Sequence, residues 1–364
     1  MENKILIVFG TRPEIIKLFP IIKLIKEENL LNNFVLVNTN QHENLTLILQ
    51  NELDIIPDII LSVPHEKSLA GKLSFILSGL QNVIESFDSA SIAGILGQGD
   101  TLSCLAASMT AFLNKIKFLH IESGLRTYNL ENPFPEEYFR QIISLSSSLN
   151  FAPNENSRKN LLAEGVPDSK IIVSGNTIVD TMKLLTNKES GDHPKNKVLI
   201  TCHRRENQNQ NLITLIKSVH QLGIENTDFE FIWISHPAPF ILNILNKYKD
   251  AVCFSILRPQ SLSELYKLYK QTAIIITDSG GIQEEAVTFK IPTIIVRKCS
   301  DRNESIELGY SILSDPAYES INSAFQKFKL KKPHFQESPF GHGNSSSIIL
   351  QKIKDDLLRA KVQH

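Results

Sequence analysis

Three carboxylates stand at positions where general acid–base chemistry is expected. Asp100 follows a glycine-rich turn, Glu122 ends a short apolar run, and Glu136 opens a helical stretch after a proline. Each is explained equally well as a residue favoured at a helix start, or for Glu122 as an ion pair with Arg126. All three nevertheless come from the first half of the chain and from strand ends or helix starts. Together they predict an acid–base site.

Cations and small-residue turns predict that an anion binds near these carboxylates. Arg12 and Lys17 accompany the turn that opens the first helix. Ser279-Gly280-Gly281 leads into another helix, whose first N–H groups and dipole favour a diphosphate. Glu285, one turn later, is placed to accept ribose hydroxyls, and Arg302 adds positive charge. The alternative explanation of the first turn is a tight βα connection with a surface arginine.

His203 is the histidine best suited to chemistry. It follows an apolar strand and precedes Arg204 and Arg205. Because charged residues are rarely buried, a histidine next to two arginines is a poor core residue and a good candidate for a site. His236 also follows a predicted strand.

Strands alternate with helices along the chain. The first half is predicted to have strands at 5–9, 34–38, 92–96 and 117–121, with helices beginning at 13 and spanning 43–53, 69–84 and 102–113. The second is predicted to have strands at 198–202, 229–234, 273–277 and 293–296 and helices at 212–222, 262–270 and 282–289. This alternation predicts two doubly wound α/β domains with parallel sheets and a crevice between them. Since such sheets bind ligands beyond the carboxyl ends of their strands, the residues named above are well placed.

Composition excludes several classes of protein. A chain of 364 residues with 42% hydrophobic residues and a net charge of −1 is typical of two globular domains and of neither a nucleic-acid binder nor a membrane-surface binder. The four cysteines form no CxxC pair, so neither a zinc ribbon nor a disulfide framework is expected. No signal peptide or membrane span is recognised, so a soluble cytoplasmic protein is expected. P-loop and GxGxxG motifs are absent, and a nucleotide sugar fits the residues best.

The ordered motifs resemble the non-hydrolysing UDP-N-acetylglucosamine 2-epimerase family. They are GTRPE, QH, GD, HIESGLR, PEE, HRREN, DSGGIQEEA and DR, and the resemblance runs from Ile5 to the segment ending at Gly343. It implies GT-B architecture, with two facing Rossmann-like domains and a last helix that packs back on the first domain. The domains implied are 1–174 with the acid–base residues, 175–345 with the UDP site, and the helix 346–364.

The resemblance implies that UDP-GlcNAc and UDP-ManNAc are interconverted without a redox cofactor or a metal, supplying sugars for cell-surface polysaccharide. UDP is eliminated to give 2-acetamidoglucal and is then added back with inversion at C2. A homodimer is implied. The matching catalytic positions are Asp100, Glu122, Glu136 and His203; those that hold UDP are Arg12, Lys17, Gln260, Ser279, Gly280, Gly281, Glu285 and Arg302; the candidate allosteric positions are Gln41, His42, Arg205 and His236.

Some positions depart from the family pattern and leave alternatives open. Glu66-Lys67 replaces an Arg-Gln pair of the allosteric site, Phe139-Arg140 replaces Asn-Arg, and Asn303 replaces a proline after Arg302. The alternatives are an epimerase of a modified UDP-HexNAc, a hydrolysing epimerase that releases ManNAc and UDP, a GT-B glycosyltransferase and a non-catalytic UDP-sugar binder. Which carboxylate removes the C2 proton and which returns it is left open.

Overall fold

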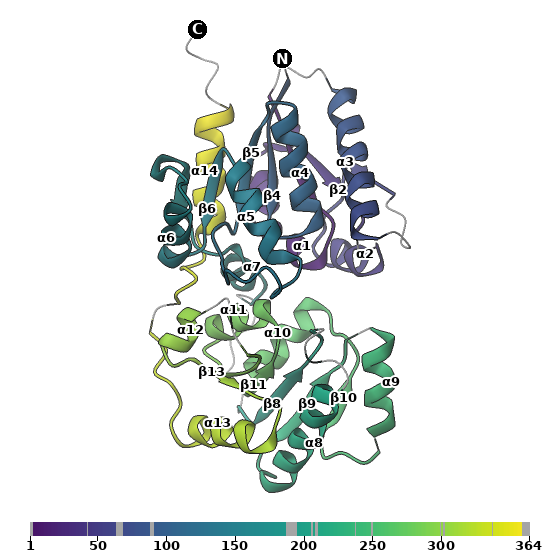
Figure 1. The fold of residues 1–364 in the computed structure, drawn as a ribbon, viewed down its shortest axis with the longest axis vertical. Coiled ribbons are helices and arrows are strands. Elements are labelled where there is room, and N and C mark those ends of the chain that lie inside the picture. Colours follow the sequence, from purple (N-terminus) through teal and green to yellow (C-terminus); the bar gives the residue numbers. More distant parts are fainter. Residues whose placement is uncertain are drawn as a thin grey trace. The chain divides into compact units, whose positions relative to one another are not determined.

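The computed structural model describes residues 3–41, 43–62, 68–87, 91–186, 195–204, 207, 210–236, 238–248, 250–298, 300, 303–336 and 338–358. The chain forms two compact units, one of Met1–Leu184 with Phe340–His364 and one of Leu185–Pro339. In each unit, helices cover a parallel sheet (Figure 1). The predicted α/β class with two parallel sheets is confirmed.

The first unit has a seven-stranded sheet in the order β3-β2-β1-β4-β5-β6-β7. Its elements are β1 (Lys4–Phe9), α1 (Arg12–Glu27), β2 (Phe34–Asn38), α2 (Glu43–Glu52), β3 (Ile59–Ile60), α3 (Leu69–Ser86), β4 (Ile92–Gln98), α4 (Leu102–Leu113), β5 (Lys117–Ile121), α5 (Glu136–Ser146), β6 (Leu149–Ala152), α6 (Glu155–Ala163), β7 (Ile171–Val173), α7 (Thr177–Thr186) and α14 (Ser345–Ile353).

The second unit has a six-stranded sheet in the order β10-β9-β8-β11-β12-β13. Its elements are β8 (Lys197–Thr201), α8 (Gln210–Glu225), β9 (Glu230–Ile234), α9 (Pro239–Tyr248), β10 (Ser255–Leu257), α10 (Leu262–Lys270), β11 (Thr272–Thr277), α11 (Gly280–Thr288), β12 (Thr293–Val296), α12 (Asn303–Glu307), β13 (Ser311–Ser314) and α13 (Tyr318–Leu330).

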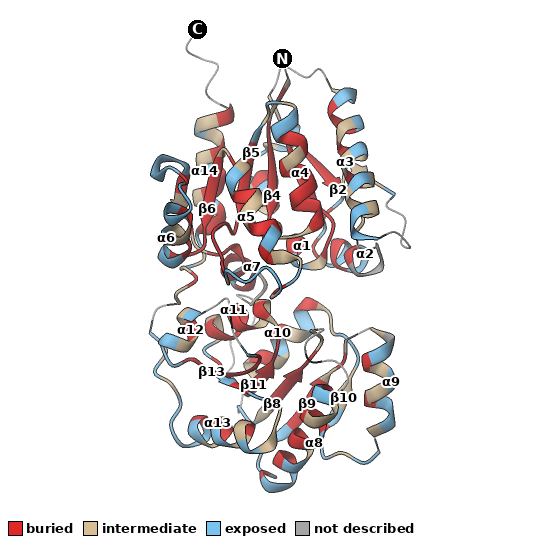
Figure 2. Cartoon of the chain, in the orientation of Figure 1, coloured by how far each residue is buried: buried red, intermediate tan, exposed pale blue. Residues whose placement is uncertain are grey.

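The central strands are buried on both faces. Residues 5–9 of β1 and 272–277 of β11 are all buried. Figure 2 shows the same for most of β4, which is drawn in red. Helices on both sides of a parallel sheet cover both of its faces, so its strands are continuous apolar runs rather than alternating ones. This is why both strands could be predicted from the sequence.

Each sheet reverses its strand order at one point, and the candidate residues follow the strands at that point. In the first unit the reversal lies between β1 and β4, and in the second between β8 and β11. A crevice forms beyond the carboxyl ends of strands at such a switch point. Asp100 follows β4, His203 follows β8 and Ser279 follows β11.

The first unit continues to Leu184 in α7 and also contains α14 near the end of the chain. Thr181 Oγ1 of α7 donates a hydrogen bond to Ile16 O of α1 at 2.6 Å, and Ser346 N of α14 donates to Asp180 at 2.8 Å. α14 ends in a π-helical turn, Lys354–Leu358. The boundary expected after residue 174 lies before α7, whereas the first unit of the structure extends to Leu184.

No helix of the described residues is long and apolar enough to cross a membrane.

Candidate active site

Glu122 follows β5 and is held by side chains from three other segments. Its φ of 64° lies in the left-handed region, which non-glycine residues adopt rarely and at a cost of about 1–3 kcal/mol, most often at functional sites. The carboxylate accepts hydrogen bonds from Lys17 Nζ, Gln98 Nε2 and Asn176 Nδ2, the last at 3.0 Å. An ionised carboxylate only accepts hydrogen bonds, so ammonium and amide donors match it.

Lys17 therefore forms an ion pair with a predicted catalytic residue. Both side chains are nearly buried, with 8% and 6% of the Lys17 and Glu122 side chains exposed. Paired charges are tolerated in such surroundings, whereas a single buried charge is not. The assignment of Lys17 as a UDP contact stays a prediction.

Asp100 is held by Arg140 and remains accessible. Arg140 Nε on α5 donates to Asp100 Oδ2 at 2.8 Å, and 29% of the Asp100 side chain is exposed. Arg140 NH1 also lies 3.5 Å from Glu137 Oε2. Because β4 and β5 are neighbours in the sheet, Asp100 and Glu122 follow adjacent strand ends. The structure thus brings two of the predicted carboxylates to the same edge.

The two glutamates that open α5 have different surroundings. Glu137 is fully buried and accepts hydrogen bonds from Thr127 N at 3.0 Å and Tyr128 N at 3.1 Å. It therefore fixes the loop before the helix. Glu136, the predicted catalytic residue, is half-buried at the first position of α5.

Glu14 is an anchor that sequence reasoning did not assign. Its carboxylate is buried and accepts hydrogen bonds from Gly10 N at 2.9 Å, Thr11 N at 2.8 Å and Thr101 Oγ1 at 2.6 Å. Burial raises the pKa of Glu14 to about 7, although these hydrogen bonds oppose the shift. Glu14 thus joins the start of α1 to the start of α4.

The side chain of Arg12 is half-buried and forms no hydrogen bond or ion pair with any residue that the structure describes. A guanidinium suits an anionic ligand, and the assignment of Arg12 as a UDP contact stays a prediction.

His120 is a buried neutral histidine beneath this edge of the sheet. Its Nε2 lies 2.7 Å from Gly99 O, and it is 1% exposed. Desolvation lowers the pKa of His120 to about 4, against a weaker raising effect of the contact with Gly99. The histidine therefore supports the turn that presents Asp100.

Two further polar residues of the first unit, Gln41 and Arg126, form hydrogen bonds to other side chains. Gln41 Oε1, a candidate allosteric residue, accepts a hydrogen bond from Ser103 Oγ at 3.0 Å. Arg126 forms a bidentate pair with Glu164, with both N–O distances 2.7 Å. The structure thus gives Arg126 a partner other than Glu122, which had been one explanation of the HIESGLR motif.

The second unit has a buried carboxylate, Asp278, at the end of β11. It accepts hydrogen bonds from His203 N at 3.0 Å, Arg204 N at 2.9 Å and Asn207 Nδ2 at 3.0 Å. Asp278 is fully buried. It therefore fixes the backbone of the HRREN segment to the neighbouring strand end.

His203 lies beside Asp278 and stacks on His236. The His203 Nδ1 to Asp278 Oδ1 distance is 3.5 Å, and the two imidazole centroids are 5.2 Å apart with planes at 13°. Desolvation lowers the pKa of His203, with Asp278 opposing the shift. His236 Nδ1 accepts a hydrogen bond from Ala238 N at 3.1 Å. About a third of the His203 side chain, 35%, is exposed, so it can reach a ligand.

The start of α11 has the features of an anion site. Ser279 is its N-cap residue and forms no side-chain cap hydrogen bond, and Gly280 and Gly281 are the first helical residues. The first N–H groups of a helix lack intrahelical acceptors. A Cβ built on Gly281 would have no heavy atom within 4 Å. A ligand can therefore approach this backbone closely.

The remaining predicted UDP contacts are partly described. Glu285 Oε2 accepts a hydrogen bond from Tyr269 Oη at 2.7 Å, and Glu285 is nearly buried. Gln260 Nε2 donates to Arg258 O at 2.6 Å. The predicted residues His42, Arg205 and Arg302 lie outside the described residues.

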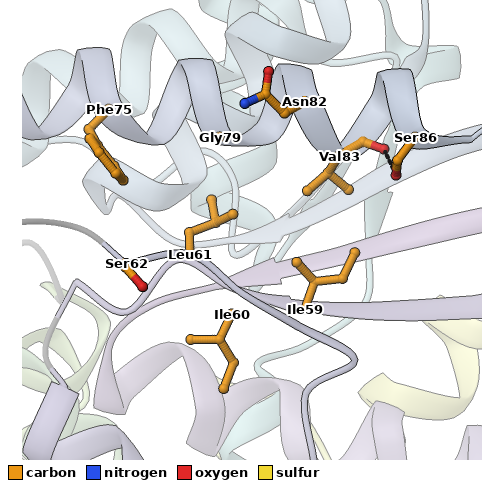
Figure 3. A pocket seen from close by; sticks show the side chains of 9 residues that line it. All are labelled: Ile59, Ile60, Leu61, Ser62, Phe75, Gly79, Asn82, Val83 and Ser86. Atoms are coloured by element: carbon orange, nitrogen blue, oxygen red, sulfur yellow. Dashed lines mark hydrogen bonds between the residues drawn. The ribbon is translucent and has the colours of Figure 1, made fainter.

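A cavity of about 380 Å³ lies elsewhere in the first unit. Figure 3 shows α3 supplying Phe75, Asn82, Val83 and Ser86, with Ile59 to Ser62 opposite. None of the predicted site residues lines it, and its walls are mainly apolar. It is therefore not where acid–base chemistry is expected.

Comparison with known proteins decides the family. A family model described as UDP-N-acetylglucosamine 2-epimerase matches residues 24–354. The chain belongs to this family. The UDP-N-acetylglucosamine 2-epimerase of Salmonella borreze is 35% identical over 371 residues, covering 96% of this chain and 97% of that protein. The predicted family and enzyme class, an isomerase, are confirmed.

Solved structures of this epimerase family have the same fold. The Neisseria meningitidis UDP-GlcNAc 2-epimerase bound to UDP-GlcNAc is 32% identical, covers 97% of this chain and 100% of its own, and gives a TM-score of 0.87. The Methanocaldococcus jannaschii enzyme in complex with UDP-GlcNAc and UDP is 31% identical, with coverages of 98% and 100% and a TM-score of 0.85. These similarities confirm the predicted GT-B class.

Sequence reasoning missed the residues that hold the candidate catalytic ones. Gln98 and Asn176 contact Glu122, Arg140 contacts Asp100, and Asp278 lies beside His203. Asp278 opens the DSGGIQEEA motif after β11, and Gln98 is the last residue of β4, next to the glycine-rich turn before Asp100. Their positions at strand ends could therefore have indicated them. Asn176 had no such signal.

Proposed function

We propose that this chain interconverts UDP-N-acetylglucosamine and UDP-N-acetylmannosamine by eliminating UDP and adding it back. The observation that carries the proposal is the pair of fixed carboxylates at adjacent strand ends, Glu122 with its three donors and Asp100 with Arg140. Family membership supports the reaction, and relatives solved with UDP-GlcNAc support the substrate.

The chemistry requires carboxylates of this kind. The C2 proton of the sugar is not acidic, so its removal must be coupled to departure of UDP from C1. UDP then adds back to C1 of the intermediate 2-acetamidoglucal, and C2 takes up a proton on its opposite face. Proton removal and return on opposite faces require more than one acid–base group. We assign this work to Asp100, Glu122 and Glu136 in the first unit.

The second unit is proposed to bind UDP. The pyrophosphate leaves with negative charge, which the first N–H groups of α11 at Ser279, Gly280 and Gly281 would stabilise. Arg302 would add formal charge in this unit, where His203 is the proposed acid–base group. Glu285 is proposed to contact the ribose hydroxyls and Gln260 the uridine. Arg12 and Lys17, which belong to the first unit, are further proposed contacts of the diphosphate.

The proposal includes no metal. It also includes no redox cofactor, since elimination and re-addition of UDP leave the oxidation level of the sugar unchanged. It also includes a homodimer in the cytoplasm that supplies sugars for cell-surface polysaccharide. Light scattering of the purified protein tests the dimer.

The reaction is tested with UDP-GlcNAc in deuterated water, followed by NMR. We expect UDP-ManNAc with deuterium at C2, because the proton exchanges with solvent in the eliminated state. UDP-ManNAc without deuterium would exclude this mechanism, and free ManNAc with UDP would indicate a hydrolysing enzyme. Turnover that requires an added acceptor would indicate a glycosyltransferase. A parallel panel of modified UDP-HexNAc sugars identifies the preferred substrate.

A further inference from the structure

Asn176 connects the candidate catalytic Glu122 to the segment in which the chain returns to the first unit. It lies between β7 and α7 and is 2% exposed. Its Nδ2 donates to Glu122 Oε1 at 3.0 Å, the same oxygen that Lys17 contacts, while Gln98 contacts Oε2.

The orientation of the Asn176 amide is fixed by its other contacts. Its Oδ1 accepts a hydrogen bond from Ile178 N at 3.1 Å, as an N-cap side chain does at the second helical position. Because the oxygen is used by the helix, the NH₂ group must face Glu122. The backbone N–H of Asn176 donates to Phe340 O at 2.8 Å. One residue thus caps α7, contacts Glu122 and binds the returning chain.

The segment before α7 and the returning segment Phe340–Ser345 are in direct backbone contact around Asn176. Gly175 has φ 85° and Gly341 has φ 100°. A Cβ on Gly341 would lie 3.0 Å from Gly175 Cα, and one on Gly175 would lie 2.6 Å from Ser345 Oγ. A Cβ at position 175 would force Ser345 Oγ to move, and the positive φ at both positions favours glycine. Asp180 further fastens the start of α14.

We propose that Asn176 is a positioning residue for Glu122, which holds the carboxylate at a fixed place relative to the returning segment Phe340–Ser345. Lys17 has a long flexible stem, and its ammonium can follow the carboxylate wherever it moves. Asn176 is short and fixed at both ends, so it defines where Oε1 lies. This inference rests on the proposed epimerase function.

The test uses substitutions that keep the helix cap but remove the donor. Serine and aspartate are N-caps as good as asparagine, so Asn176→Ser and Asn176→Asp leave α7 capped. We expect kcat of Asn176→Ser to fall roughly 10- to 100-fold with UDP affinity unchanged, since small displacements of a reacting group have effects of this size. Asn176→Asp places a second carboxylate against Glu122, so we expect a larger fall and an acidic limb of the pH–rate profile moved to higher pH.

The matched control is Thr181→Val, which removes another buried tertiary hydrogen bond of the same helix, that to Ile16 O. We expect it to lower the melting temperature and to leave kcat and the pH–rate profile unchanged. A merely structural Asn176 would behave like this control. Wild-type kcat and pH profile in Asn176→Ser would therefore overturn the proposal.

A second readout does not depend on turnover. The Glu122 carboxyl carbon, labelled with ¹³C and assigned through its loss in Glu122→Gln, reports the titration of this group by NMR. We expect the midpoint of this titration to rise in Asn176→Ser and to rise further in Asn176→Asp. Both variants keep the Lys17 side chain, so the change is due to Asn176 alone. An unchanged midpoint overturns the positioning role even if the wild-type chain turns over no UDP-GlcNAc, whereas an inactive wild type with a shifted midpoint overturns only the proposed function.

Discussion

The candidate residues of the two units are positioned in different ways. In the first unit, Glu122 and Asp100 are each held by side chains from distant segments, including Lys17 and Arg140. In the second unit, the start of α11 offers backbone N–H groups and a glycine with open space around it. Proton transfer requires reacting atoms at a fixed distance, whereas a diphosphate is bound by a fixed dipole that tolerates small displacements. The difference matches the proposal that the carboxylates of the first unit move protons and that the start of α11 in the second unit binds the diphosphate.

The surroundings of two aspartates, one in each unit, sharpen this contrast. Asp278 in the second unit is fully buried and accepts two backbone N–H groups, those of His203 and Arg204. Asp100 in the first unit keeps 29% of its side chain exposed. The oxygens of Asp278 are used by the loop that it organises, whereas the exposed part of Asp100 can be reached by a substrate. Asp278 is therefore interpreted as the support of His203 rather than as a reacting group.

The largest expected effect is that of Glu122→Gln. The amide cannot take a proton, so we expect kcat to fall by about 10²- to 10⁴-fold while UDP affinity is retained. Stability should also decrease, because buried Lys17 loses its charge partner and breaking such a pair costs about 3–5 kcal/mol. Deuterium incorporation at C2, calorimetric UDP binding and thermal unfolding measure the three quantities.

The control for that variant is Glu164→Gln, which breaks the ion pair with Arg126 in the same unit. Turnover should be unchanged in it. Equal losses of turnover in the two variants would mean that any ion pair of this unit matters, and the distinction between a reacting and a supporting carboxylate would fail.

Much of the fold could be predicted from the sequence because its elements carry strong local signals. The strand at 34–38 and the helix at 102–113 match β2 and α4, since one is a continuous apolar run and the other begins after the N-cap residue Thr101. β3, with two residues, and β7, with three, carry no measurable period and were not predicted. Their place is set by pairing with longer neighbours.

The positions of the candidate carboxylates could be predicted from the sequence, but their partners could not. Asp100 and Glu122 stand directly after strands, so their position follows from the parallel sheet. Arg140 is 40 residues from Asp100 and Asn176 is 54 from Glu122. Contacts over such separations depend on how the connecting helices pack, and no local pattern records that.

His120 and His203 offer a second comparison between the units. For His120 the expected change in the free energy of unfolding with pH is about 3 kcal/mol. The pKa of His120 is about 4 in the folded protein, below its ordinary 6.5. Between these values the unfolded chain binds a proton that the folded chain does not, so stability falls as the pH falls from 6.5 to 4. His120→Gln keeps a donor for Gly99 O and removes the titration. We expect the stability difference between wild type and variant to shrink by about 3 kcal/mol from pH 7 to pH 4.

Hydrogen exchange of β5 amides at several pH values measures this difference in the first unit. A constant difference from pH 7 to pH 4 would contradict the neutral, supporting role of His120. His203→Ala should show the reverse behaviour, with turnover lost and the pH dependence of first-unit stability unchanged, because His203 belongs to the second unit.

The smallest expected effect is that of Gly281→Ala, which tests whether the second unit keeps open backbone for a ligand. The added Cβ meets no atom within 4 Å, and replacing glycine by alanine at a compatible helical position stabilises a protein by about 0.4–1 kcal/mol. The same methyl group stands where a diphosphate would approach the first N–H groups of α11. We therefore expect slightly higher stability and UDP affinity weaker by about tenfold, the equivalent of one charged hydrogen bond.

Trp233, the single tryptophan, is fully buried in the second unit, so its fluorescence reports the unfolding of that unit. Titration with UDP gives the affinity of the same sample. Opposite signs of the two changes are the decisive result, because a damaged fold cannot become more stable while it binds more weakly. Unchanged UDP affinity in a stabilised Gly281→Ala would mean that the ligand does not approach this turn, and the contrast between side-chain and backbone recognition would no longer hold.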